Sequence, residues 1–130
     1  MSKLKTTFDL KNTFSGVMHV PGADVPVGGE QGELLPYDML FGALATCVYS
    51  TFLDIVNKKK ISFDRATMSI EGEKRSEVPT TLIWVDTQLV IYGAENEKAL
   101  EKSFELATKY CSIYQTISSV AEMRWDVEFR

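Results

Sequence analysis

The feature that most constrains the fold of this chain is an apolar segment from Pro36 to Asn57. Its main apolar side chains recur at helical spacings, at Leu40, Leu44, Cys47, Val48, Tyr49, Phe52, Ile55 and Val56. Pro36 suits the first turn of a helix. Other apolar residues lie off that stripe, at Phe41, Ala43, Ala45 and Leu53. The segment therefore predicts one long helix that needs cover on nearly all sides, from its own sheet and from a partner subunit.

Polar residues interrupt this helix at Thr46, Ser50, Thr51 and Asp54, which favours a buried helix over a membrane span. The first seven residues carry lysines but no apolar segment behind them, so no secretory signal is expected. A cytoplasmic protein without a membrane partner is the resulting expectation.

The rest of the chain alternates between strand and helix patterns, which predicts a single α+β domain over residues 1–130. Strands are expected over residues 4–10, 14–20, 66–71, 81–92 and 123–130, with a loop of glycines and prolines after residue 20. The 81–92 strand is apolar on both faces and should lie centrally in its sheet.

Two further helices are expected before the last strand. Asn96 is a good N-cap for an amphipathic helix that ends at Lys109 or Tyr110. Ser112 and Gln115 have the spacing of a capping box, which predicts a short helix whose N-terminus lies at Cys111.

The charge of the chain excludes some classes of partner. A net charge of -4 gives no electrostatic reason to bind nucleic acid or anionic lipid. Two distant cysteines and one histidine do not make the usual closed zinc site, so neither a metal nor a cofactor is expected.

Two cysteines in a reducing compartment indicate either inert packing or redox chemistry. Cys47 lies midway along the apolar helix, far from its N-terminus, so burial should raise its pKa. Cys111 precedes the short helix, whose first amides should favour its thiolate. The two thiols are therefore predicted to differ in acidity.

The residues around both cysteines resemble the OsmC/Ohr family of thiol-dependent peroxide-handling proteins. The resemblance is carried by Gly28-Gly29-Glu30-x-Gly32, Pro36-Tyr37-Asp38-x-Leu40 and Ala43-Leu44-Ala45-Thr46-Cys47, with the second cysteine between two helices. It covers essentially the whole chain.

The resemblance implies an α+β fold in which an antiparallel sheet packs on long central helices of an intertwined homodimer, with each active site at the subunit interface. It further implies that the Cys47 thiolate attacks an organic hydroperoxide, a small-molecule substrate, to give a sulfenic acid. Cys111 then closes a disulfide, and a dithiol reductant of the lipoyl type reopens it.

The sequence departs from the family pattern at the groups that activate the first cysteine. The peroxidases of the family use a glutamate ten residues before that cysteine, paired with an arginine from the N-terminal strands. This chain has Tyr37 at that offset, and its first arginine is Arg65. The candidates to replace the pair are Tyr37, Asp38, Glu30, Glu33 and His19, the only histidine.

Three functions remain open from the sequence. The first is a peroxidase with an apolar pocket, for which Phe41, Leu44, Val48 and Ile113 are candidate lining residues. The second is a ligand-binding or redox-sensing protein on the same fold without efficient turnover. The third treats both cysteines as core residues.

Overall fold

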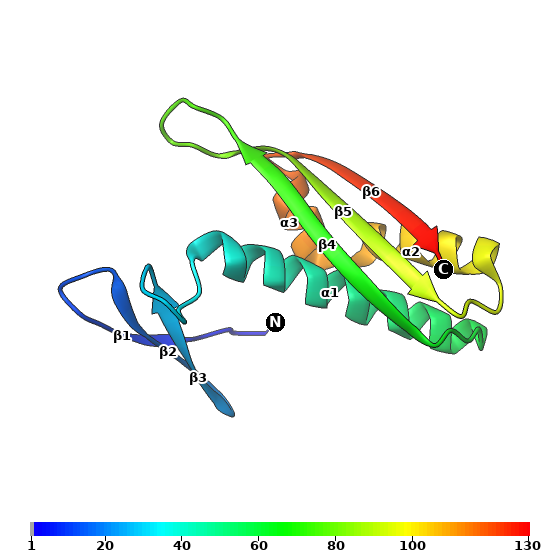
Figure 1. The fold of residues 1–130 in the computed structure, drawn as a ribbon, viewed down its shortest axis with the longest axis horizontal. Helices are drawn as coiled ribbons and strands as arrows, with labels where there is room; N and C mark the ends of the chain where they lie inside the picture. The colour runs from blue at the N-terminus through cyan, green and yellow to red at the C-terminus, as the bar shows by residue number, and fades with distance from the viewer. Residues whose placement is uncertain (1) are drawn as a thin grey trace. The chain divides into compact units, whose positions relative to one another are not determined.

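The computed structural model of the protein describes residues 2–130, which divide into an N-terminal unit ending at Gly42 and a C-terminal unit, Ala43–Arg130. The N-terminal unit contains an antiparallel three-stranded sheet in the order β1-β2-β3 (Figure 1). Its strands are β1 (Thr7–Leu10), β2 (Ser15–Val20) and β3 (Ala23–Gly28). The first two form the hairpin that the alternating pattern predicts.

Strand β3 corrects the prediction of a loop after residue 20. Pro26 lies opposite Val17 in the β2–β3 pairing. Proline lacks the N–H that a ladder needs, but it is tolerated on an edge strand, and β3 is an edge strand of this sheet. The glycines and prolines after residue 20 predicted a break in the strand pattern, but residues 23–28 still pair with β2.

The long apolar segment forms helix α1 (Pro36–Lys59), as predicted. Four side chains at four-residue intervals are fully buried along it, at Leu44, Val48, Phe52 and Val56. By length and composition α1 could also cross a membrane, because its four polar residues do not interrupt it enough to exclude this. Only 22% of its most apolar window is buried inside the chain, so one copy leaves much of this helix uncovered.

The C-terminal unit contains a second sheet in the order β4-β5-β6, with β5 central as predicted. The strands are β4 (Arg65–Lys74), β5 (Leu82–Tyr92) and β6 (Glu122–Phe129). Strands β4 and β5 are antiparallel, but β5 and β6 are parallel, so the expectation of an antiparallel sheet is wrong for this pair. Parallel neighbours need a crossover, and here the two helices α2 (Glu97–Tyr110) and α3 (Ser112–Ser118) form it.

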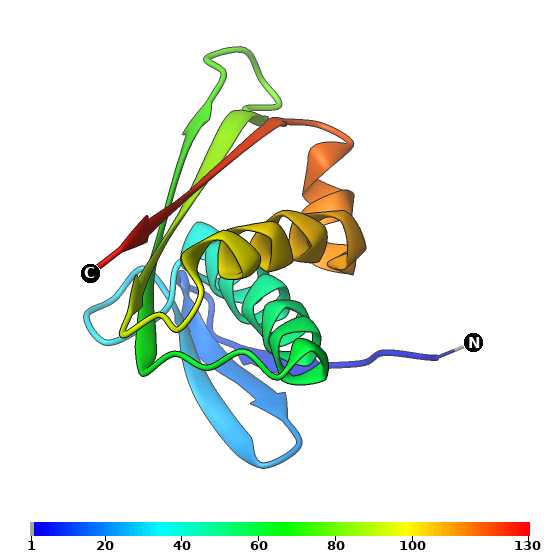
Figure 2. The ribbon, with the colours of Figure 1, turned by 90° about the vertical axis from the view of Figure 1, so that its right-hand side faces the viewer.

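The core of the C-terminal unit lies between this sheet and the helices. Figure 2 shows α1 and α2 on the same face of the sheet. Phe104 of α2 packs its ring 5.9 Å from that of Phe52 on α1 and 5.7 Å from Trp125 on β6. The inward residues of β5 are buried, whereas Ile83 on the same strand is 48% exposed. A single chain therefore covers one face of β5 well and not both.

Candidate active site

The structure brings the two predicted cysteines together. Cys47 lies on α1 and is partly buried, whereas Cys111, between α2 and α3, is completely buried. Both are free thiols, and the Cys111 Sγ–H donates to Cys47 Sγ across 2.9 Å. Residues distant in sequence therefore form one dithiol pair inside the C-terminal unit, and oxidants reach Cys47 more easily than Cys111.

Cys111 also caps both helices that meet at it. Its backbone N–H donates to Ala107 O at the end of α2 (2.9 Å), and its Sγ accepts from the N–H of Tyr114 in α3 (3.3 Å). The predicted short helix is confirmed, but the predicted capping box is wrong. Cys111 itself is the N-cap, and the Gln115 side chain donates to Thr108 O.

Hydrogen bonds make Cys47 the more acidic thiol. Burial raises the pKa of Cys47, but hydrogen bonds from the Cys111 thiol, the Ile113 N–H and the hydroxyl and N–H of Ser112 outweigh it. The pKa of Cys47 therefore lies below its ordinary value. This result is opposite to the expectation from its place on α1, because its donors come from the α2–α3 region and not from its own helix.

The acidity of Cys111 is also opposite to the prediction. Burial is the largest cause that raises the pKa of Cys111, and the hydrogen bond to Cys47 and the nearby Cys47 charge add to it. The Tyr114 and Ile113 amides oppose these effects, and the resulting pKa is about 11. Cys111 is thus the protonated donor and Cys47 the acceptor. Of the two thiols, Cys47 is therefore the one that loses its proton more readily.

The five other candidate residues all lie in the N-terminal unit, where the structure shows partners for each. Glu33 accepts from the Ser15 hydroxyl (2.5 Å) and the Glu30 N–H (2.9 Å), and these bonds lower the pKa of Glu33. Ser15 also donates to Glu30 at 3.5 Å. The two glutamates therefore hold the loop after β3 to β2.

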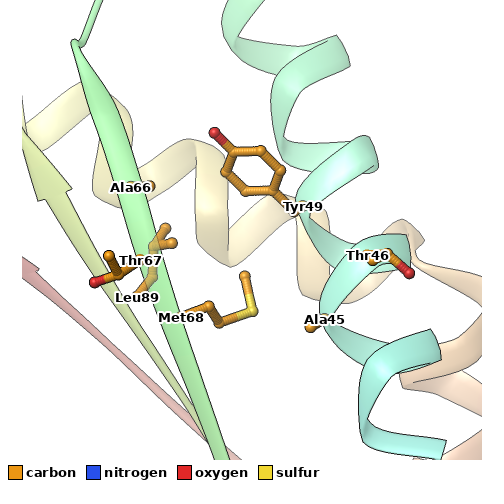
Figure 3. Close-up of a pocket in the computed structure, with 7 residues that line it drawn as sticks. All are labelled: Ala45, Thr46, Tyr49, Ala66, Thr67, Met68 and Leu89. Carbon is orange, nitrogen blue, oxygen red and sulfur yellow. The ribbon is translucent and has the colours of Figure 1, made fainter. Parts of the chain in front are cut away.

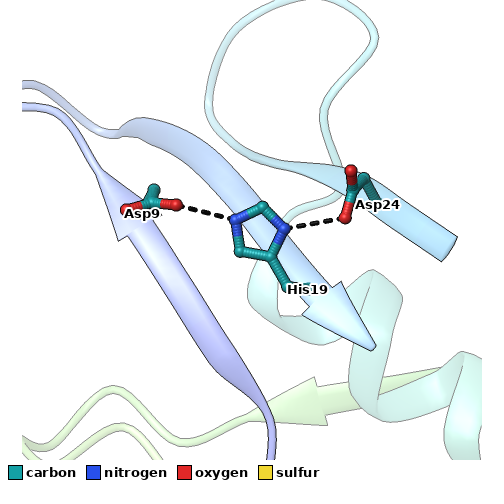
Figure 4. A network of polar contacts seen from close by, with 3 residues as sticks. All are labelled: Asp9, His19 and Asp24. Atoms are coloured by element: carbon teal, nitrogen blue, oxygen red, sulfur yellow. Dashed lines mark hydrogen bonds and ion pairs between the residues drawn. The ribbon is translucent and has the colours of Figure 1, made fainter. Parts of the chain in front are cut away.

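At the start of α1, Asp38 accepts from the Leu35 N–H (2.9 Å), and the ring of Tyr37 packs edge-on against Phe41 with centroids 6.1 Å apart. His19 lies on β2 between two aspartates (Figure 4), with Nδ1 2.7 Å from Asp24 and Nε2 2.7 Å from Asp9. A role of these residues at Cys47 stays a prediction.

All four arginines of the chain lie in the C-terminal unit, and each has a contact of its own there. Arg65 and Arg124 stack on the rings of Tyr92 and Trp84. Arg75 donates to Pro79 O, and Arg130 pairs with Glu128. Among residues 43–130, the hydrogen-bond donors to Cys47 thus come from the Cys111–Ile113 segment and not from an arginine.

An apolar cavity of about 220 Å³ lies between α1, the helix that carries Cys47, and the β4-β5-β6 sheet (Figure 3). It is lined by Ala45, Thr46, Tyr49, Ala66, Thr67, Met68 and Leu89. Two residues expected to line a pocket, Leu44 and Val48, are instead fully buried core. The described residues 2–130 contain no cluster of three His, Cys, Asp or Glu side chains suited to a metal ion.

The identity of the fold follows from comparison with known proteins. Residues 29–126 match the family of OsmC-like proteins, which spans three quarters of the chain and includes both cysteines. This chain belongs to the OsmC-like family. No curated protein matches its sequence significantly.

Solved structures share the fold of this OsmC-like protein over nearly its whole length. An OsmC-like protein from Mycoplasma pneumoniae superposes with a TM-score of 0.86 at 17% identity, covering 98% of this chain and 97% of that one. A hypothetical protein from Aquifex aeolicus gives 0.85 at 22% identity, covering 100% and 99%. An organic hydroperoxide resistance protein from Legionella pneumophila gives 0.76 at 18% identity, covering 98% and 99%. At these identities the similarity establishes the fold.

The site of this OsmC-like protein contains residues whose role sequence analysis missed. The sequence predicts Ser112 as a helix cap and Ile113 as a pocket residue, yet both donate hydrogen bonds to Cys47. The feature of the sequence that could have indicated this role is their position directly after the second cysteine. Nothing in their spacing showed which of the two thiols they would face.

Proposed function

We propose that this protein is a thiol-dependent peroxidase that reduces organic hydroperoxides. The observation that carries the proposal is the 2.9 Å contact between an accessible thiol of lowered pKa and a buried thiol of raised pKa. Low-pKa, accessible cysteines beside a second cysteine are the usual sites of reversible oxidation. Family members described as hydroperoxide resistance proteins support the same chemistry.

In the first step, the Cys47 thiolate attacks the terminal oxygen of the hydroperoxide. An S–O bond forms, the O–O bond breaks, and the alkoxide leaves and takes a proton from water to become the alcohol. Cys47 is left as a sulfenic acid. The donors from Cys111, Ser112 and Ile113 supply the thiolate stabilisation that the missing glutamate and arginine would otherwise provide.

In the second step, Cys111 attacks the sulfenic sulfur, water leaves, and a Cys47–Cys111 disulfide forms. The first step prepares the second, because the Cys47 thiolate is one cause of the raised Cys111 pKa. Once that thiolate becomes a neutral sulfenic acid, its charge no longer opposes deprotonation of Cys111. The resolving thiol therefore becomes a better nucleophile at the moment it is needed.

A dithiol reductant completes the cycle by two exchange steps that take the disulfide back to two thiols and oxidise the donor to its own disulfide. We propose a lipoyl-type donor and a cytoplasmic setting, where such dithiols stay reduced. The apolar cavity beside the helix favours an organic substituent on the substrate over hydrogen peroxide.

We propose a homodimer as the working assembly. Helix α1 is apolar enough for a membrane span, and much of its surface is uncovered by its own chain. In the C-terminal unit this surface includes Ala45 and Tyr49, which line the apolar cavity together with Ala66 and Met68 of β4 (Figure 3). A second copy packing along α1 removes this apolar surface from water.

The test is stopped-flow consumption of cumene hydroperoxide by the reduced protein, with dihydrolipoamide as donor and hydrogen peroxide as the comparison oxidant. Wild type should turn over rapidly and saturably. Cys47→Ser should lose the reaction. Without the donor, Cys111→Ser should consume one equivalent of hydroperoxide and stop at the sulfenic acid, because it has no internal thiol to close a disulfide.

Two results would contradict the proposal. A wild-type rate equal to that of a free thiol at the same pH would remove the catalytic function and leave a ligand-binding or redox-sensing protein on this fold. Undiminished turnover in Cys47→Ser would show that the reacting group lies elsewhere.

A further inference from the structure

The junction between α2 and α3 consists of one extended residue, Cys111, with φ -71° and ψ 116°. A helix that stops leaves its last carbonyls without their regular donors. Ala107 O still has its regular donor, the Cys111 N–H four residues on. Thr108, the next residue, is only 5% exposed, so its carbonyl needs a donor from the protein.

Gln115 supplies that donor. Its side-chain Nε2 donates to Thr108 O at 3.0 Å, and its backbone N–H donates to Cys111 O, also at 3.0 Å. One residue is therefore attached to the last turn of α2 and to the junction itself. Cys111 lies between these two attachments, and among the described residues Gln115 provides the side-chain hydrogen bond that joins α2 to α3.

We propose that Gln115 is a positioning residue that holds Cys111 against Cys47. Its bridge to Thr108 fixes the angle between the two helices and so keeps the buried Cys111 thiol 2.9 Å from its partner. Its part in resolving the sulfenic acid rests on the proposed peroxidase function. Its effect on thiol alignment does not, because that alignment is measurable without any peroxide.

The measurement is the equilibrium of the protein with dithiothreitol. The two cysteines form a disulfide while oxidised dithiothreitol takes up the two electrons and two protons and becomes the dithiol. The equilibrium constant gives the effective concentration of one cysteine relative to the other, which falls when Cys111 is less well held.

Three variants separate positioning from general helix stability. Gln115→Leu keeps the size of the side chain and removes its N–H donors. Gln115→Lys keeps a donor at a similar reach. Ser118→Ala removes the bond from the Ser118 hydroxyl to Gln115 O, which lies wholly within the end of α3.

We expect Gln115→Leu to lower the effective concentration about two- to tenfold, the range for one lost hydrogen bond. Gln115→Lys and Ser118→Ala should stay within about twofold of wild type. A Gln115→Leu value equal to wild type overturns the proposal. So does an equal fall in Ser118→Ala, since it would assign the effect to loss of α3 stability.

A second experiment connects the bridge to catalysis. After cumene hydroperoxide, Gln115→Leu should show less disulfide and more sulfenic acid trapped by dimedone than wild type, and more sulfinic acid at high oxidant. An unchanged ratio of disulfide to trapped sulfenic acid counts against the proposal. If wild type does not react with the hydroperoxide but the dithiothreitol equilibrium responds as expected, the peroxidase function fails and the positioning role stands.

Discussion

At the scale of single residues, the chemistry of this protein depends on which sulfur receives the available hydrogen bonds. The Cys111 thiol donates a hydrogen bond to Cys47, and its sulfur accepts one from the Tyr114 N–H. Cys111 is therefore both a donor to Cys47 and the N-cap of α3. A thiolate stabilised by such donors has a lowered pKa, and removing a donor must raise it. The contribution of Cys111 can be isolated by replacing its sulfur.

Cys111→Ala and Cys111→Ser form the matched pair for this measurement. Serine keeps a hydroxyl that can donate to Cys47 and cap α3, whereas alanine keeps neither. We expect the pKa of Cys47 to be higher in Cys111→Ala than in Cys111→Ser, because alanine cannot donate to the thiolate. The pH dependence of alkylation by iodoacetamide gives both values, and equal midpoints would contradict the assigned donor role.

His19 is the second residue with a definite titration. Both of its ring nitrogens face carboxylates, so both carry protons in the bonded state. The hydrogen bond to Asp24 and then the bond to Asp9 raise the pKa of His19 above its ordinary 6.5. Its support for the β1-β2-β3 sheet is therefore complete below pH 6.5 and disappears as pH rises through the raised pKa.

An NMR titration of the His19 ring should show a midpoint above 6.5. Asp24→Asn should lower that midpoint more than Asp9→Asn, because the Asp24 bond is the larger cause. In wild type, amide exchange in β1 should become faster as pH passes the midpoint, after correction for the intrinsic pH dependence of exchange. A midpoint at or below 6.5 would show that the aspartates do not hold the charged ring.

At the scale of elements, β5 organises the C-terminal unit, and it contains one unusual buried group. Among residues 2–130, Thr87 Oγ1 is the buried side-chain oxygen or nitrogen with no hydrogen-bond partner. Thr87 is 0% exposed and lies on the inward face of β5, between Val85 and Leu89. A buried hydroxyl without a partner loses its hydration and gains nothing in return.

Thr87→Val removes this hydroxyl and keeps the branched shape of the side chain. We expect the free energy of unfolding to rise by about 1 kcal/mol, measured by urea denaturation at constant m-value. Thr81→Val, at an exposed position just before β5, is the control and should change stability little. A destabilised Thr87→Val protein would mean that the hydroxyl has a partner in solution.

At the scale of the whole molecule, the open question is what covers α1. Its buried residues repeat every four positions, and a separate polar stripe runs along it through Ser50 and Asp54, which are exposed. Between these lies the apolar side at Ala45 and Tyr49. The proposed second copy belongs on that apolar side and not on the polar stripe.

Ala45→Glu places a charge in the apolar cavity and should convert the dimer to monomer at micromolar concentration, measured by light scattering after size exclusion. Ser50→Glu adds the same charge to the polar stripe of the same helix and should leave the dimer intact. The proposed packing of a second copy along α1 would be contradicted if both variants were dimers, or if the wild-type protein were a monomer.

The sequence alone determined the features that depend on local signals. The helical spacing of apolar residues placed α1, the Asn96 side chain placed the start of α2, and the alternation after residue 122 placed β6, all confirmed by the structure. These signals are readable because periodicity and capping involve residues within a few positions of each other. The resemblance to the OsmC/Ohr family, and not these local signals, selected Cys47 and Cys111 as a reactive pair, and the structure brings the two sulfurs into contact.

Only the tertiary structure decided the direction of β6 and the acidity of the two thiols. Strand direction depends on where the α2–α3 crossover returns the chain, and no local pattern in β6 records it. The pKa of Cys47 depends on donors from Ser112 and Ile113, far from it in sequence. Hydrogen bonds and burial act through space, so the order of the two pKa values became visible only once the chain was folded.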